Sequence, residues 1–394
     1  MPAAKNNPVI RRPAAPKAAE TQLRLFATVP LGAEELAAGE LAALGARDIV
    51  VVRGGVAFEG SRELLYRALL CLRTVSRVLL QVGSFSCRGP AELYDGVRAL
   101  PWPELLTPDM TLAVDCNLRD AALTHGHFAA LKAKDAIVDR LRDDCGRRPS
   151  IDTKTPDLRV NLHLVGSECT VSLDASGVPL DRRGWRQDRT AAPLRETLAA
   201  AVMLFCGWDG SVPLLDPMCG AGTLLLEGAA IALRRPAGAG RSFGLERWRD
   251  FDARLWRKVL REVTALARDQ LEVPILGRDR DPAALAACRN NARRAGLEHA
   301  VRWERGVFED SVPPGPAGIM VLNPPYGVRL GEKETLVPLY RRIGDLCKER
   351  FGGWTLWLLV GDRELAQEIG LRPSRRHVLF NGPIECRLLR YELF

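Results

Sequence analysis

The residues whose chemistry is most readily interpreted are Asn323-Pro324-Pro325-Tyr326, which directly follow the apolar run Gly318–Leu322. A short apolar run that ends in a proline-rich corner predicts a buried strand leading into a rigid loop. The two prolines fix φ and remove two backbone donors, so the loop presents carbonyl oxygens, one side-chain amide and one aromatic ring. This combination suits a planar base or amide that bears an NH2 group and stacks on Tyr326. Taken alone, the motif is also compatible with a purely structural loop.

A second candidate site is the segment 214–227, LLDPMCGAGTLLLE, in which a short apolar run passes through a glycine-rich turn into a helical pattern. In open α/β sheets such turns lie at the carboxyl ends of strands, where ligands bind. Gly220 and Gly222 would let a ligand approach the backbone closely. Asp279, at the end of the next predicted strand, would accept hydrogen bonds from both hydroxyls of a ribose. The full GxGxxG fingerprint is missing from the sequence, which disfavours a pyrophosphate ligand.

A ribose-bearing cofactor without pyrophosphate indicates S-adenosylmethionine, whose positive charge the Asp216 carboxylate would attract. The order of a DxxxGxG turn, an acidic strand end and the Asn-Pro-Pro-Tyr corner predicts a class I methyltransferase domain. The ten Cys and five His form no CxxC pair or cluster at ligand spacing, so we expect no metal. The predicted cofactor residues are Asp216, Pro217, Met218, Gly220, Gly222, Thr223, Asp279, Phe308 and Asn323.

Methyl transfer to an exocyclic base nitrogen would explain the Asn-Pro-Pro-Tyr corner. The Asn323 side-chain oxygen and the Pro324 carbonyl would accept the two protons of this nitrogen and direct its lone pair at the methyl group. Tyr326 would stack on a base turned out of its helix. Asn323, Pro324, Pro325 and Tyr326 are therefore the predicted catalytic residues. Cys219 lies in the cofactor turn rather than the substrate loop, which disfavours a role as nucleophile.

The 394 residues, of which 47% are hydrophobic, are enough for several domains with full cores. Over residues 193–394 strands and helices alternate and end in a hairpin, which predicts a mostly parallel sheet with an antiparallel terminal strand. A long helix over 251–271 would carry one apolar face. Residues 21–75 show a β-α-β-β-α order, residues 76–176 form a second α+β module, and 177–192 are expected to be a linker. Residues 1–20 are rich in Ala, Pro and basic side chains, and we expect a disordered tail.

The net charge of +8 is compatible with a nucleic-acid partner without demonstrating one. Lys132 and Lys134 on a predicted helix, and Arg182, Arg183 and Arg186 in the linker, are candidate RNA contacts, although a solvated basic face fits equally well. No apolar run reaches the ~18 residues that span a bilayer, and residues 1–20 lack the apolar core of a secretory signal. We expect a cytoplasmic protein that acts as a monomer.

From about Leu23 onward the chain resembles the guanine-N2 rRNA methyltransferases that carry an N-terminal THUMP domain, the RlmL type acting on 23S rRNA. The resemblance implies a ferredoxin-like module, a THUMP RNA-binding domain and a Rossmann-like methyltransferase domain that methylates guanine N2 in RNA. Some bacterial members carry a second methyltransferase domain, whose activity we expect to be absent from this chain. The matching stretches are Gly54-Gly55-Val56 with Phe58, and residues 130–139, 156–161, 173–177, 196–201, 214–226, 323–327 and 351–354.

One position departs from this family, and three other functions remain open. Many relatives hold the adenine amino group with an Asp after the third strand, where this chain has Gly306; Glu309, Asp310 or backbone groups would have to replace it, with Phe308 packed on the ring. The alternatives are a THUMP-bearing tRNA guanine-N2 methyltransferase, an adenine-N6 or glutamine-N5 methyltransferase with the same motif, and a non-catalytic RNA-binding or assembly protein. The N-terminal half disfavours a DNA enzyme, and the intact Asn323 disfavours the non-catalytic function.

Overall fold

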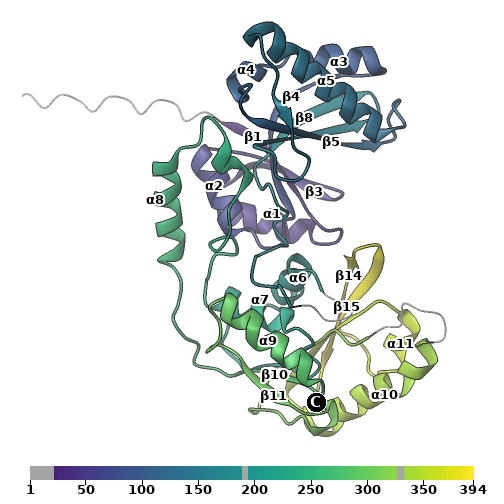
Figure 1. The fold of residues 1–394 in the computed structure, drawn as a ribbon. Coiled ribbons are helices and arrows are strands. Elements are labelled where there is room, and N and C mark those ends of the chain that lie inside the picture. Colours follow the sequence, from purple (N-terminus) through teal and green to yellow (C-terminus); the bar gives the residue numbers. More distant parts are fainter. Residues whose placement is uncertain (1–21, 189–193, 326–331) are drawn as a thin grey trace, which may run out of the picture.

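Two β-sheets organise the chain, one in each half of the molecule (Figure 1). The computed structural model describes residues 22–188, 194–325 and 332–394. The predicted tail over residues 1–20 and the predicted catalytic Tyr326 lie outside these described residues. Within the described part, no helix is long and apolar enough to cross a bilayer. All ten Cys are free thiols.

The first elements form the β-α-β-β-α module that the sequence pattern predicts. The hydroxyl oxygen of Ser61 accepts a hydrogen bond from the backbone N–H of Leu64 at 3.2 Å and so caps the second helix. Gly54, with a φ of +82°, permits the tight turn between the two hairpin strands. The elements are β1 (Leu23–Thr28), α1 (Glu34–Ala43), β2 (Arg47–Val52), β3 (Gly55–Gly60) and α2 (Arg62–Cys71).

Strand β4 (Arg77–Ser86), which we did not predict, joins this module to the next one. It pairs antiparallel with β1 and with β8 (Glu168–Asp174), giving the order β2-β3-β1-β4-β8-β7-β5-β6. The run 78–80 is buried at every position, so the alternation that marks a half-buried strand is missing there. The sheet therefore continues across the predicted boundary between residues 75 and 76. The other elements are α3 (Pro90–Arg98), α4 (Trp102–Leu105), β5 (Thr111–Arg119), α5 (Gly126–Cys145), β6 (Ser150–Ile151) and β7 (Leu158–Val165).

The second sheet has the predicted doubly wound architecture, with the strand order β11-β10-β9-β12-β13-β15-β14. Strands β9 to β13 pair in parallel, whereas β15 pairs antiparallel with β13 and β14. This confirms the mostly parallel sheet with an antiparallel terminal strand. The elements are α6 (Glu196–Cys206), β9 (Leu214–Asp216), α7 (Thr223–Ala232), β10 (Ile275–Asp279), α9 (Pro282–Arg294), β11 (Arg302–Arg305), β12 (Gly318–Leu322), α10 (Glu332–Arg350), β13 (Trp354–Val360), α11 (Arg363–Gln367), β14 (Arg375–Asn381) and β15 (Ile384–Glu392).

Helix α8 (Ala253–Thr264) corrects the predicted helix over 251–271 in both length and position. Figure 1 shows it beside α2, away from the second sheet, although it lies in the sequence between α7 and β10. Its apolar face, Trp256, Val259 and Val263, is buried in the core of the N-terminal half. The ten residues of α2 offer a partner surface about 15 Å long. Beyond Thr264 the apolar residues have no partner surface on α2, and Leu266 is 63% exposed.

Polar contacts fasten the same segment to the N-terminal half. The backbone N–H of Asp252 donates to the hydroxyl oxygen of Tyr66 at 3.0 Å, and the Tyr66 ring meets Trp256 edge-on with centroids 5.3 Å apart. The ammonium of Lys258 on α8 lies 3.2 Å from the carboxylate of Glu63 on α2. The segment between α7 and β10 is thus an arm, defined here as residues 243–264, that holds the two halves together.

Candidate active site

Three strand ends meet at one edge of the second sheet. Strand β9 lies between β10 and β12, so Asp216, Asp279 and Asn323 follow or end neighbouring parallel strands. The chain runs from β9 to β10 and β11 on one side and then returns to β12 on the other side, and such switch points are where open α/β sheets bind ligands. A cavity of about 450 Å³ opens at this edge. Its lining includes Pro217, Met218, Asp279, Gly306, Phe308, Glu309, Asn323 and Pro325.

The glycine turn between β9 and α7 has the backbone that the sequence predicts. Gly220 and Gly222 have φ values of +54° and +79°, a region that side chains other than hydrogen disfavour. A Cβ at Gly222 would lie 2.6 Å from Cη2 of Trp303, so a larger residue would also clash with the indole. Asp279 fixes the turn from the neighbouring strand, because its Oδ2 accepts a hydrogen bond from the N–H of Gly220 at 2.9 Å.

Asp216 supports the turn from below rather than lining the cavity. Its side chain is 2% exposed, and its Oδ1 accepts a hydrogen bond from the N–H of Met218 at 3.1 Å. Burial raises the pKa of the Asp216 carboxyl to about 8; the bond to Met218 opposes this shift, and the charge of Asp279 adds to it. Gly222 and Thr223, the N-cap and first residue of α7, likewise lie outside the lining of the cavity. The structure therefore brings Pro217, Met218 and Asp279 to the cavity, with Asp216 one layer deeper.

Asn323 presents an unsatisfied acceptor at this cavity. Its Oδ1 is buried and has no hydrogen-bond partner among the described residues. An orphan of this kind costs about 1–3 kcal/mol, which a donor on a bound ligand would recover. Pro324 and Pro325 follow Asn323 directly. The Tyr340 hydroxyl of α10 donates a hydrogen bond to the Pro325 carbonyl at 3.2 Å and so fixes this backbone. Pro324 is buried and Pro325 is exposed.

The opposite wall of the cavity is made by the segment after β11. Phe308, 5% exposed, and Glu309 line it, whereas Asp310 does not. The N–H of Gly306 donates to the backbone carbonyl of Asp279 at 3.1 Å, which holds this segment against β10. A Cβ at Gly306 would lie 3.3 Å from Cδ of Arg278. Of the two acidic candidates for the adenine amino group, the structure places only Glu309 at the cavity.

Residues 183–390 match a family model described as the methyltransferase domain of RMKL-like proteins. The chain belongs to this methyltransferase family. Residues 24–79 match the ferredoxin-like domain of RlmL, and residues 88–174 match the THUMP domain. S-adenosylmethionine is the methyl donor, and the cavity fits it: an aromatic ring, a carboxylate at a strand end and the first residues of the turn after β9, Pro217 and Met218, line the space.

The most informative relatives agree with this assignment along nearly the whole chain. Ribosomal RNA large subunit methyltransferase K/L of Methylococcus capsulatus is 44% identical over 379 residues, which cover 93% of this chain and 51% of the relative. A putative RNA methyltransferase of Synechocystis is 41% identical and is covered to 96%. The crystal structure of SMU.472, a putative methyltransferase complexed with SAH, has a TM-score of 0.87 at 29% identity and covers 95% of this chain. The chain spans about half the length of the K/L relatives it matches.

The structure corrects two of the predicted RNA contacts of the methyltransferase. Arg183 is 4% exposed and donates to Glu227 and to the carbonyl of Leu180. Arg186 is paired with Glu196 on α6 at 3.0 Å, and burial raises the pKa of that carboxyl to about 7. The linker sequence shows the positive charges, but the carboxylates that pair with them lie on α7 (Glu227) and at the start of α6 (Glu196). Arg182, in contrast, is exposed.

The two predicted lysines lie on α5 with partners of their own. The ammonium of Lys132 lies 4.7 Å from the centre of the Tyr94 ring, and that of Lys134 lies 2.6 Å from Oδ1 of Asp135. Both lysine side chains are half-buried. They remain predicted RNA contacts, although neither is a free charge.

A polar groove across the N-terminal sheet was missed by the sequence reasoning. Its volume is about 1,020 Å³, and its walls come from both N-terminal modules. The consecutive strands β7 and β8 contribute to it at alternate positions, Asn161 with His163 and Thr170 with Ser172. The alternation of polar residues along β7 and β8 is the sequence pattern that could have indicated this groove. The basic and amide side chains of this sheet groove are Arg53, Arg77, Gln81, Asn117, Arg119, His127, Asn161 and His163.

Proposed function

We propose that the protein transfers the methyl group of S-adenosylmethionine to the exocyclic N2 of a guanine in RNA, with 23S rRNA as the substrate. The orphaned Asn323 oxygen carries this proposal, because it is an acceptor waiting for an NH2 group beside the cofactor turn. The names of the K/L relatives and the THUMP match over 88–174 support RNA and the large ribosomal subunit.

The chain's own residues would bind the cofactor through three contacts. Phe308, which lines the cavity, would pack on the adenine ring. Asp279 already accepts the N–H groups of Gly220 and Asp281, both at 2.9 Å. A carboxylate has about four lone-pair sites, so two remain for the ribose hydroxyls. The glycine turn lets the rest of the molecule lie against the backbone.

Catalysis then consists of orienting the target nitrogen. The methyl donor supplies an electrophilic carbon. Asn323 Oδ1 and the Pro324 carbonyl accept hydrogen bonds from the guanine NH2, which draws its lone pair out of conjugation and aims it at that carbon. Both groups are acceptors and neither takes the proton, which leaves the nitrogen for solvent after transfer. No covalent enzyme intermediate is required.

The sheet groove would bind the RNA outside the target nucleotide. Arg53 and Arg119 are exposed there, and the one carboxylate of the lining, Asp115, is paired with Arg159 at 2.7 Å. Burial lowers the pKa of the neighbouring His163, and the charge of Arg119 adds to this. A basic groove with amides suits a phosphate backbone and the edges of unpaired bases.

Nucleoside mass spectrometry of rRNA and tRNA from a deletion strain tests the proposal. We expect N2-methylguanosine to disappear from 23S rRNA, to return with the wild-type gene and to stay absent with Asn323→Ala. Loss of the mark from tRNA instead would favour the tRNA enzyme. An unchanged N2-methylguanosine level with loss of N6-methyladenosine would replace guanine by adenine as the substrate.

A further inference from the structure

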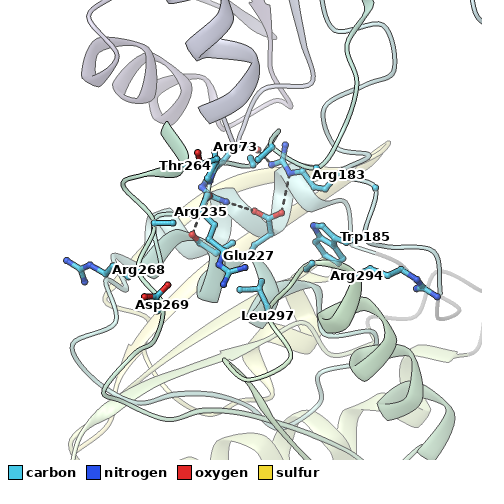
Figure 2. Close-up of a pocket in the computed structure, with 18 residues that line it drawn as sticks. Arg73, Arg183, Trp185, Glu227, Arg235, Thr264, Arg268, Asp269, Arg294 and Leu297 are labelled. Atoms are coloured by element: carbon cyan, nitrogen blue, oxygen red, sulfur yellow. Dashed lines mark hydrogen bonds and ion pairs between the residues drawn. The ribbon is translucent and has the colours of Figure 1, made fainter. Parts of the chain in front are cut away.

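A second cavity, of about 370 Å³, lies where the two halves of the molecule meet (Figure 2). It shares no lining residue with the cofactor cavity. Helix α7 begins at the cofactor turn and reaches this junction cavity with Glu227 and Ala230. At ~1.5 Å per residue, Glu227 lies about 6 Å and Ala230 about 10 Å along the helix from Thr223 at the cofactor turn.

The wall of the junction cavity contains a buried excess of positive charge. Glu227, 2% exposed, accepts a hydrogen bond from Arg73 Nη1 and another from Arg183 Nε, both at 3.3 Å. One carboxylate thus faces two buried guanidinium groups, whose other donors reach backbone carbonyls such as those of Ala230 and Leu180. Burial lowers the pKa of Arg73; the charges of Glu227 and Glu40 oppose this shift, and the charge of Arg183 adds to it. A buried charge without a full counter-charge is costly, and an anion in the cavity would relieve it.

Further arginines surround the space. Five arginines and two carboxylates line it, a formal excess of three positive charges. Arg235 and Arg268 have no carboxylate within 4.0 Å in the part of the chain that the structure describes, whereas Arg294 is paired with Asp188 at 3.1 Å. Arg235 uses Nη1 on the carbonyl of Gly296, at 2.7 Å, and its other donors remain for a ligand. Figure 2 shows the guanidinium of Arg235 below Glu227, whereas the side chain of Arg268 extends outward, away from both.

We propose that this junction cavity holds a backbone phosphate of the substrate RNA, away from the nucleotide that is methylated. The inference rests on the proposed function. Guanidinium groups in a partly desolvated cavity are the ordinary partners of phosphate oxygens. The volume lies in the range of about 300–1,000 Å³ that holds nucleotide-sized ligands. Trp185, half-buried at the same wall, adds an apolar face for the adjoining sugar or base.

The test compares the double variant R235Q/R268Q with the control R254Q. Gln at position 235 removes the charge but is too short to keep the bond to the Gly296 carbonyl, so the melting temperature without ligand checks that the fold is retained. Arg254 is an exposed arginine of the arm outside the cavity lining. RNA affinity is measured on 23S rRNA from the deletion strain at several salt concentrations. Binding of inorganic phosphate and of adenosine monophosphate is measured separately, as the rise in melting temperature that each causes. The affinity for S-adenosylmethionine is measured as a check that the second sheet is intact.

Each lost phosphate contact lowers RNA affinity about threefold near 0.1 M salt and flattens the log–log salt slope by ~0.7–0.9. We therefore expect R235Q/R268Q to bind RNA about tenfold more weakly, with R254Q and cofactor affinity unchanged. RNA binding equal to that of R254Q overturns the proposal. If phosphate raises the melting temperature of wild type but not of the double variant, while RNA affinity stays at the control value, the cavity serves a free phosphorylated ligand and the RNA assignment is wrong. Failure of the proposed function would appear differently, as wild-type protein that methylates no RNA.

Discussion

Asn323 is the residue on which the proposed chemistry depends, because its buried side-chain oxygen has no hydrogen-bond partner among residues 22–188, 194–325 and 332–394. Asn323→Ala removes an acceptor that acts most strongly in the transition state. We expect the single-turnover methylation rate to fall by about 10²–10³, as for the loss of one oriented polar group in other active sites. Cofactor affinity, measured by titration calorimetry, should change far less. A rate within a few-fold of wild type would show that the Pro324 carbonyl and the loop position the nitrogen without Asn323.

Asp216 makes stability depend on pH. Its pKa in the folded protein, about 8, lies above the ordinary value of 3.8. The folded state therefore holds the proton more tightly than the unfolded state. Below pH ~4 both states are protonated and Asp216 does not destabilise the fold. As the pH rises toward 8, the unfolded state loses its proton first, and the free energy of unfolding of the wild type falls progressively. Asp216→Asn keeps an acceptor for Met218 and cannot ionise. We expect its melting temperature, relative to wild type, to rise between pH 4 and pH 8 in calorimetric scans.

Asp95→Asn is the control for this pH dependence, since Asp95 is an exposed acid on α3. Its difference from wild type should stay nearly constant over the same range. A pH-independent difference for Asp216→Asn as well would contradict the raised pKa.

The sequence predicted the positions of the site residues better than their environments. Asp279 and Asn323 were placed at strand ends by the apolar runs before them, and in the structure both line one cavity. Arg183 was predicted to contact RNA because only its charge is visible in the sequence. Its partner, Glu227, is 44 residues away on a helix, and no local pattern indicates that the two are buried together.

Helix α8 connects the two halves through one apolar face. Trp256 is 9% exposed and meets the rings of Tyr66, Phe243 and Phe251. Trp256→Ala would leave a cavity where the arm packs on α2, and we expect it to lower the free energy of unfolding by about 3–5 kcal/mol. Urea unfolding followed by circular dichroism measures this loss.

Leu266→Ala is the matched control, because this side chain follows the same helix but is 63% exposed. It should change the free energy of unfolding by no more than about 0.5 kcal/mol. Equal effects of the two substitutions would mean that the arm does not pack on α2 in solution.

The contrast between α8 and the second sheet shows what an apolar pattern can predict. Alternating strands and helices constrain one another, so the order of a doubly wound sheet with an antiparallel terminal strand was predictable. A single amphipathic helix shows which face is buried but not against which surface, and α8 was accordingly assigned to the wrong half. Strand β4 was missed because its buried run over 78–80 lacks alternation.

The molecule places a large basic groove and the cofactor cavity on different sheets, held at a fixed relation by the arm and by the Arg73–Glu227–Arg183 cluster. To methylate one nucleotide in a large RNA, the groove and the cofactor cavity must keep a fixed distance. The four predicted catalytic residues, 323–326, would contact too little RNA to select that nucleotide by themselves. If the groove binds RNA as we propose, far from the target nucleotide, its binding energy acts equally in the ground state and the transition state. It should therefore appear in KM rather than in kcat.

Removing charge from the sheet groove separates these two quantities. We expect R53Q/R119Q to raise KM for 23S rRNA about tenfold near 0.1 M salt, through two lost phosphate contacts, with kcat unchanged. R88Q, an exposed arginine of the same half outside the groove lining, is the control. Steady-state kinetics at several salt concentrations measures both parameters. A fall in kcat with an unchanged KM would mean that the groove acts on the cofactor site rather than on RNA, and kinetics equal to R88Q would place the RNA on another face of the protein.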